Sequence, residues 1–205
     1  LDPPGGFVQN ANDVPWINSI PRVLKPEDYP AHVAATEPMS MRAQMSASAL
    51  MGTGKLSFGE FTRRKLLTVS LLAERMKQAL LAASADSTDP DVRAARDVLA
   101  GWDNRFEADS RGALLFEEWA KAFAGPGLDD QRNFTRSWTL DDPLATPSGI
   151  RDDSAATAML RAAAATVKAR HGRIDPRFGD VSRFSAGEAL SVPGHGGLGG
   201  LGLFR

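Results

Sequence analysis

Proline is concentrated at the start of this chain, and its distribution limits what the first part can become. Seven of the thirteen prolines lie among the first 38 residues. Each proline lacks a backbone amide hydrogen and disfavours helical geometry in the residue before it, so this density excludes a long helix. We therefore expect residues 1–38 to form an extended segment with turns, in which Phe7–Asn12 is a strand.

The pattern changes after Pro38, where apolar residues recur at helical spacing between capping and stop signals. Ser57 with Glu60 has the form of a capping box, and Asp89 followed by Pro90 is typical of a helix start. The sequence predicts a helical region over residues 39–172 with about five helices. They are expected at Ser40–Met51, from Ser57 to Leu80 with a kink near Thr68, from Pro90 to Trp102, from a Ser110 cap to Phe123, and from Asp152 or Asp153 to Arg170.

Helix signals end at Gly172, and the rest of the chain is rich in glycine. Six of the twelve residues from Gly194 to Arg205 are glycine, which indicates either a flexible segment or a close approach of the backbone to its surroundings. Residues 173–205 are therefore predicted to be a glycine-rich return segment. The predicted fold class is mainly α, a helical segment with short strands at both ends, and a hydrophobic fraction of 42% is enough to bury a core.

Composition excludes several classes of function. With 24 Lys and Arg against 25 Asp and Glu, the net charge of −1 gives no general attraction to nucleic acid or to an anionic membrane. The absence of cysteine excludes disulfides, thiolate metal sites and a cysteine nucleophile. No apolar run approaches the roughly 20 residues of a membrane-spanning helix. We expect no nucleic-acid partner and no membrane span. Because the chain begins at Leu1 without an initiator methionine, we interpret it as a processed or cut piece.

Metal and cofactor sites are not expected either. The three histidines are too far apart in the sequence to form a helical ligand pair. Gly194, Gly196 and Gly199 have the spacing of a dinucleotide-binding motif, but the strand before it and the helix after it are missing.

The segment with the most specific chemistry is Asp2–Trp16, in which a proline-glycine turn leads to the amide side chains of Gln9, Asn10 and Asn12. An asparagine amide has two donor hydrogens and an acceptor oxygen without a charge. It therefore suits a site that holds a developing oxyanion on one side and a nucleophilic amine on the other. The alternative interpretation is an Asx-rich turn, which composition alone favours. Trp16 and Trp138 lie among prolines and polar residues, so they are candidates to line a cleft.

The same segment, D-P-P-G-G-F-V-Q-N-A-N-D-V-P-W, resembles a motif of the penicillin acylase family of N-terminal-nucleophile hydrolases. It is most similar to the cephalosporin acylase and acyl-homoserine-lactone acylase branches. Further stretches resemble the same branches in the same order, so the resemblance covers essentially the whole chain. They are Ser40–Gln44, Ala100–Asp103, Asp109–Trp119, Phe178–Arg183 and the end of the chain from Val192 to Arg205.

The resemblance implies an enzyme that hydrolyses N-acyl amides, with β-lactams, acyl-homoserine lactones and related N-acyl compounds as substrates. Members of the family are made as precursors that cleave themselves and leave a serine at the start of the large subunit, where its α-amino group activates its own hydroxyl. By resemblance, this chain is an internal large-subunit segment of a larger αββα hydrolase. Its nucleophile lies outside the sequence, and because position one is leucine the isolated chain is expected to be inactive.

The resemblance also implies partners and a location. The expected partners are the small subunit and the rest of the large subunit, together with an N-acyl substrate, and residues 173–205 are expected to return to the core sheets. No cofactor takes part in the family's chemistry. The expected location is the bacterial periplasm or the outside of the cell. The alternative function is a non-catalytic helical module that docks to a partner protein through an apolar surface.

Two positions match active-site residues of the family. Asn12 matches the asparagine that orients the nucleophile's amine and donates to the oxyanion, and Arg42 matches the arginine that holds this asparagine. Arg42 is unusual in its own right, because a cation is disfavoured near a helix N-terminus and its neighbours are apolar. We therefore expect it to be substantially buried and within hydrogen-bond reach of Asn12; the alternative is a solvated surface arginine.

Overall fold

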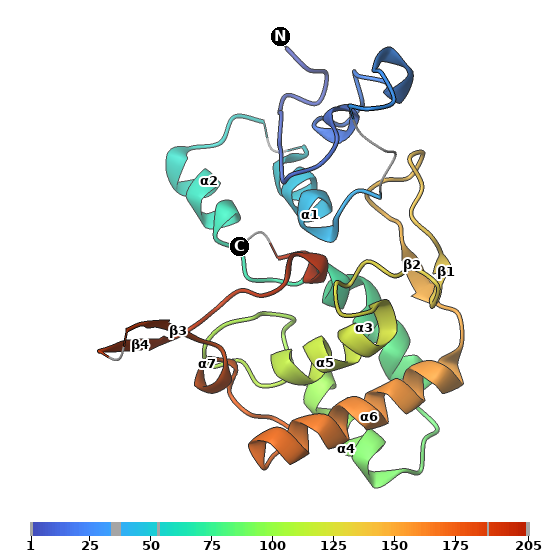
Figure 1. The fold of residues 1–205 in the computed structure, drawn as a ribbon, viewed down its shortest axis with the longest axis vertical. Helices are drawn as coiled ribbons and strands as arrows, with labels where there is room; N and C mark the ends of the chain where they lie inside the picture. The colour runs from blue at the N-terminus through green and yellow to red at the C-terminus, as the bar shows by residue number, and fades with distance from the viewer. Residues whose placement is uncertain (1, 34–37, 53, 188, 204–205) are drawn as a thin grey trace.

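The computed structural model describes residues 2–33, 38–52, 54–187 and 189–203 (Figure 1). Each of the three expected segments has residues outside the described ones: residues 1 and 34–37 in the first, residue 53 in the second, and residues 188 and 204–205 in the third. The described residues are mainly helical, which confirms the predicted class. Their helices and strands are α1 (Met41–Leu50), α2 (Phe58–Lys65), α3 (Leu71–Ala83), α4 (Pro90–Ala100), α5 (Ala113–Ala124), β1 (Phe134–Arg136), β2 (Ser148–Ile150), α6 (Asp153–His171), α7 (Phe178–Val181), β3 (Arg183–Ala186) and β4 (Leu190–Pro193), with short 3-10 turns at Pro15–Ile17, Pro26–Asp28 and Gly199–Leu201.

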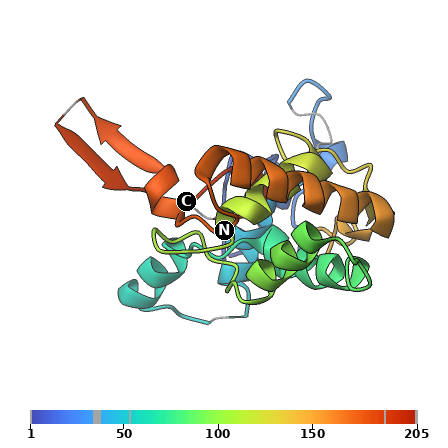
Figure 2. The same cartoon turned by 90° about the horizontal axis from the view of Figure 1, so that it is seen from below.

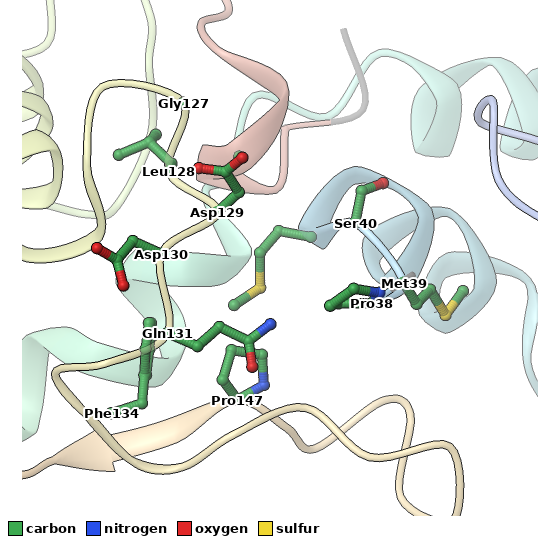
Figure 3. Close-up of a pocket in the computed structure, with 12 residues that line it drawn as sticks. Pro38, Met39, Ser40, Gly127, Leu128, Asp129, Asp130, Gln131, Phe134 and Pro147 are labelled. Carbon is green, nitrogen blue, oxygen red and sulfur yellow. The ribbon is translucent and has the colours of Figure 1, made fainter. Parts of the chain in front are cut away.

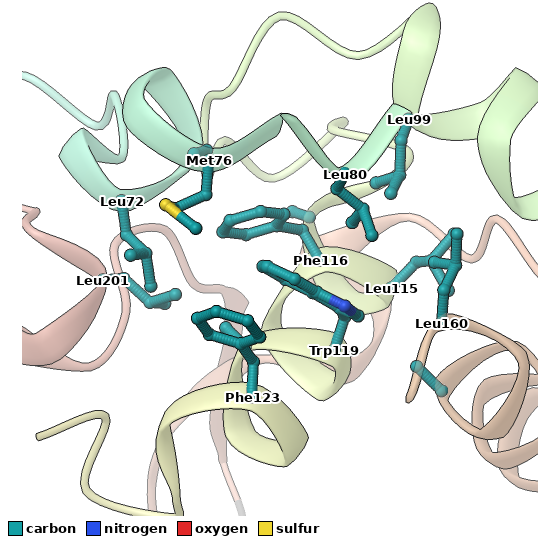
Figure 4. Packing of buried hydrophobic residues seen from close by; sticks show 14 of the residues in the cluster. Leu72, Met76, Leu80, Leu99, Leu115, Phe116, Trp119, Phe123, Leu160 and Leu201 are labelled. Atoms are coloured by element: carbon teal, nitrogen blue, oxygen red, sulfur yellow. The ribbon is translucent and has the colours of Figure 1, made fainter. Parts of the chain in front are cut away.

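The main core lies between α3, α4, α5 and α6 and is built around aromatic side chains of α5 (Figure 4). Trp119 stacks on Phe123 with ring centroids 4.8 Å apart, and its Nε1 donates to the Ala156 carbonyl of α6 at 3.2 Å. The buried face of α6 carries small residues, including Ala163 and Ala164, so this helix can approach α5 closely. These four helices form the body on which the remaining segments pack.

A second, smaller cluster attaches the proline-rich start of the chain to α1. Trp16, Ile17 and Met39 are buried against Ala43 and Ala47, which form the inner face of α1. Residues of the loop between β1 and β2 pack against the same cluster. The first part of the chain is therefore held by side-chain packing.

Most predicted helix starts are confirmed by their N-cap hydrogen bonds, as at Ser40, whose Oγ accepts from the Ala43 amide at 3.2 Å. The predicted cap of α5 is wrong. Helix α5 begins after Gly112, whose φ is 120°, and Ser110 instead accepts from Trp102 Nε1 at 2.9 Å. Because this serine oxygen satisfies the buried indole, it does not cap the helix.

Residues 57–80 form two helices instead of one helix with a kink near Thr68. The segment between α2 and α3 runs beside residues 104–106: Phe106 donates its amide to the Thr68 carbonyl at 3.0 Å, and Ser70 donates its amide to the Asn104 carbonyl at 2.9 Å. These bonds hold the backbone in an extended form, so the described residues from Ser40 to His171 contain six helices, one more than expected.

The strand expected at Phe7–Asn12 does not form. Within this stretch the Gln9 amide donates to the Asn18 carbonyl at 2.8 Å, and Asn12 adopts a left-handed φ of 69°. The stretch therefore bends back on itself, whereas a strand needs a row of bonds to an extended partner. Of the short strands expected at both ends, those of the C-terminal part are present as β3 and β4, and the β1–β2 pair was not predicted.

The C-terminal part leaves the body as the β3–β4 hairpin and then returns to it (Figure 2). Phe184 on this hairpin is 62% exposed, whereas Leu201 and Leu203 beyond it are buried. A Cβ at Gly200 would lie 2.4 Å from that of Leu128, closer than real Cβ atoms approach. Close backbone packing therefore explains this glycine better than flexibility does.

Candidate active site

Asn12 is the last amide of the cluster identified in the sequence. Its backbone amide donates to Asn10 Oδ1 at 2.9 Å, which is an Asx turn. Its side chain has another role: Oδ1 accepts from Arg42 Nη2 at 2.6 Å, and no described residue accepts from Nδ2. The turn and the arginine contact therefore occur together, and the two donor hydrogens of the exposed amide remain available.

Arg42 lies in the first turn of α1, and its Nη2 also donates to the Ala11 carbonyl at 2.7 Å. A guanidinium has donors only, so it must bind the oxygen of the Asn12 amide and leave the NH₂ group pointing elsewhere. The expected hydrogen bond between the two residues is confirmed. Arg42 is only partly buried, however, and not substantially buried as predicted, because the Asn12 side chain that it binds is itself exposed.

Asp13 connects the same turn to the start of α1. Its Oδ1 accepts from the backbone amide of Ser40, the N-cap of α1, at 3.2 Å, and its Oδ2 is buried without a partner among the described residues. Burial raises the pKa of the Asp13 carboxyl, while hydrogen bonding to Ser40 and the positive charge of Arg42 oppose that rise. Asp13 was not predicted to be a site residue. Its partner lies 27 residues away, so no local pattern could have shown the contact.

A cavity of about 260 Å³ adjoins this turn and includes Asn12, Asp13 and Pro38 in its lining. Asn12 therefore faces a concave surface. Neither Trp16 nor Trp138 contributes to it: Trp16 is 3% exposed, and both indoles pack in the second cluster. For Trp16 the expectation of lining a cleft is wrong, because burial against α1 removes its large apolar surface from water. Trp138 is half-buried, and its expected place in a cleft stays a prediction.

A larger pocket of about 390 Å³ also adjoins the start of α1. Figure 3 shows residues 38–41 facing the loop of residues 127–131 across this pocket. Pro147 completes part of the lining, and its carbonyl accepts from Arg75 Nη1 at 3.0 Å. Pro38 lines both pockets, so the segment that leads into α1 borders each of them.

The functional groups gathered at Asn12 are amides, one guanidinium and one carboxylate. The described residues contain no group of three or more histidine, aspartate or glutamate side chains placed to hold a metal ion. No helix in the described part of the chain combines the length and apolar character that crossing a membrane requires.

An oriented amide donor beside a cavity is the feature that the resemblance led us to expect, and comparison with known proteins agrees with that resemblance. The sequence model of the penicillin amidase family matches residues 1–202. The chain is similar to Aculeacin-A acylase from Actinoplanes utahensis, with 28% identity over 223 residues, which cover 97% of this chain and 26% of that protein. It thus spans only a minor part of its relative's length. With a family match over nearly all of its residues, the chain belongs to the penicillin amidase family.

Proposed function

We propose that this chain is a large-subunit segment of an N-acyl amide hydrolase that cleaves β-lactam, acyl-homoserine-lactone or related N-acyl substrates. In this proposal Asn12 supplies a hydrogen bond to the oxyanion, and Arg42 orients that donor. The observation that carries it is the 2.6 Å bond from Arg42 Nη2 to Asn12 Oδ1, which leaves Nδ2 without a described partner at the edge of a cavity. Family membership and the similarity to a protein named as an acylase support the same class of reaction.

The proposed reaction is acyl transfer to an N-terminal serine outside this chain. The serine hydroxyl attacks the carbonyl carbon of the substrate while the serine α-amino group takes the proton, and the carbonyl oxygen becomes an oxyanion. The C–N bond then breaks, the amine leaves with a proton, and water hydrolyses the ester. Asn12 Nδ2 acts at the oxyanion stage. Because its orientation is already set by Arg42, it stabilises the developing charge without having to reorganise.

The proposed protein partner is the rest of the acylase polypeptide, including the small subunit. Apolar side chains are exposed on α2 and on the β3–β4 hairpin, which lie outside the four-helix body (Figures 1 and 2). They are Phe58, which is 85% exposed, and Phe61 on α2, and Phe184 on the hairpin. They suit a surface that packs against further protein. The alternative function, a non-catalytic helical module, would use the same surfaces but has no need for an arginine bound to the Asn12 amide. For location we propose the periplasm or secretion, which the family resemblance alone supports.

The test uses the full-length polypeptide that contains this chain and measures amine release from a chromogenic N-acyl amide. We expect Asn12→Ala to lower kcat by about a hundredfold or more with KM little changed, because one oxyanion donor is lost. The unfolding midpoint should fall only as far as the left-handed φ of 69° at this residue requires. Asn104→Ala is a matched control. Asn104 also has a left-handed φ, 65°, so its replacement carries the same backbone cost, but its side chain donates to Glu74 in the helical body.

An unchanged kcat in the Asn12→Ala enzyme would return this residue to the Asx-turn interpretation and refute the proposal. Asn12→Asp should also lower kcat, because it places a negative charge where the oxyanion develops. The 205-residue chain on its own should release no amine above a heat-killed sample, since its first residue cannot act as the nucleophile.

A further inference from the structure

Arg75 on α3 is a partly buried cation that the proposed reaction does not use. Its Nη1 donates to the Pro147 carbonyl at 3.0 Å and lies 3.5 Å from Met41 Sδ, also as a donor. Its Nη2 donates to the Leu144 carbonyl at 2.7 Å and to Gln44 Oε1 at 3.0 Å. One side chain thus connects α3 to the first turn of α1 and to the loop before β2.

All of these acceptors are neutral. Burial lowers the pKa of the Arg75 guanidinium, and the negative charge of Asp142 acts in the opposite sense. A guanidinium withdrawn from water is costly unless its donors are bonded, so the acceptors must stay in place around it. The arrangement therefore holds α1 and the loop 144–147 at defined positions relative to α3.

From Gln44, hydrogen bonds continue toward the candidate active site. Gln44 is fully buried, and its Nε2 donates to the Met39 carbonyl at 2.9 Å. The next residue, Ser40, donates its backbone amide to Asp13, which directly follows Asn12. The segment that leads into α1 is thus bonded to the turn that carries the amide and to Gln44 of α1, which in turn accepts from Arg75 of the helical body.

Helix α1 is consequently connected to two guanidiniums. Arg75 contacts it from the helical body, whereas Arg42 extends from α1 to the oxygen of Asn12. In Figure 1, α1 lies between the N-terminal segment and the helices of the body. A hydrogen bond tolerates changes of only a few tenths of an ångström, so a shift of α1 by about 1 Å would break the contact that orients the amide.

We propose that Arg75 is a positioning residue for Asn12: it holds α1 where Arg42 can fix the oxyanion donor. The inference rests on the proposed function, in which Asn12 is that donor. Arginine suits the position because its planar fork supplies two nitrogens, each bonded to acceptors in different segments, whereas a lysine has one nitrogen to divide among them.

The experiment measures kcat and KM of the full-length enzyme for a chromogenic N-acyl amide, with and without Asn12→Ala. We expect Arg75→Met to lower kcat by about tenfold while KM changes by less than about twofold, and Arg75→Lys to restore part of the loss. In the Asn12→Ala background Arg75→Met should lower kcat by less than about twofold, because the donor that it positions is already gone. Gln44→Leu removes the side-chain acceptor of Arg75 on α1 but leaves its two carbonyl acceptors in the loop 144–147. We expect it to lower kcat in the same way as Arg75→Met, so it replaces that variant if Arg75→Met does not fold.

Lys77→Met is the matched control. Lys77 is a buried cation on the same helix that donates to the Trp102 carbonyl, so its loss weakens the helical body without touching α1. We expect it to lower the unfolding midpoint but to leave kcat near the wild-type value. Equal kcat losses for Lys77→Met and Arg75→Met, or an Arg75→Met loss of the same size in both backgrounds, would overturn the positioning role while leaving the proposed function intact. A wild-type kcat in Asn12→Ala alone would overturn the proposed function and the role of Arg75 with it.

Discussion

Replacing Arg42 tests how the orientation of the Asn12 amide contributes to the reaction. The replacement removes two hydrogen bonds donated by Arg42 Nη2, one to the Ala11 carbonyl at 2.7 Å and one to Asn12 Oδ1 at 2.6 Å. A hydrogen bond from a charged donor contributes about 1.5–3 kcal/mol to a folded protein. Because most of that energy is present before substrate reacts, only the part that grows in the transition state changes kcat.

That part is substantial for the Asn12 bond. When Nδ2 donates to an oxyanion, electron density moves within the amide toward Oδ1, and the bond from the Arg42 guanidinium strengthens. If about half of the bond energy appears only at this stage, Arg42→Met loses roughly 0.8–1.5 kcal/mol of transition-state stabilisation, which corresponds to about a fourfold to tenfold fall in kcat. Arg42→Lys keeps the charge but reaches one acceptor at a time, so it should lie between the wild type and Arg42→Met.

The assay is amine release from a chromogenic N-acyl amide by the full-length enzyme, with kcat and KM determined separately. Arg64→Met is a suitable control, because Arg64 also donates to a backbone carbonyl of α1, that of Ala49 at 2.6 Å, but near the other end of the helix. We expect this control to keep its kcat. If Arg42→Met retains more than about half of the wild-type kcat, or if KM alone changes, the reasoning about the oriented amide is wrong.

Helix positions were largely predictable because their signals are local. Asp89 with Pro90 and Asp152 stand directly before the helices that they cap, and the structure contains those caps. The failures have distant causes. Residues 66–70 are not helical because their backbone bonds to residues 104–106. Ser110 does not cap α5 because its hydroxyl accepts a hydrogen bond from the indole of Trp102, eight positions earlier in the chain. Neither contact can be predicted from the local sequence.

The candidate site was also predictable only where the signal is local in the sequence. Reasoning from the residues alone favoured an Asx turn at Asn12, and that turn is present. Only the family resemblance indicated the contact with Arg42 across 30 positions of sequence. Asp13 and Arg75 were not selected at all, because each acts on a partner at least 27 residues away and neither type of residue is rare at a protein surface.

Two further predictions concern the stability of the protein. Ser70→Ala should lower the free energy of unfolding by about 1–3 kcal/mol in chemical denaturation, because the buried hydroxyl both caps α3 and donates to the Leu201 carbonyl at 2.6 Å. Ser57→Ala, which removes only the exposed cap of α2, should lower it by about 1 kcal/mol or less; equal losses would contradict the role of the Leu201 contact. Asp13→Asn should change the pH dependence of stability. Because burial raises the folded-state pKa of this carboxyl, the wild type has its full contribution below the unfolded-state pKa and loses it as the pH rises through the folded-state pKa. The amide variant can still accept from Ser40 and carries no buried charge, so its unfolding free energy minus that of the wild type should increase between about pH 3 and about pH 7. A difference that stays constant or decreases over this range would show that the hydrogen bond from Ser40 and the charge of Arg42 outweigh burial.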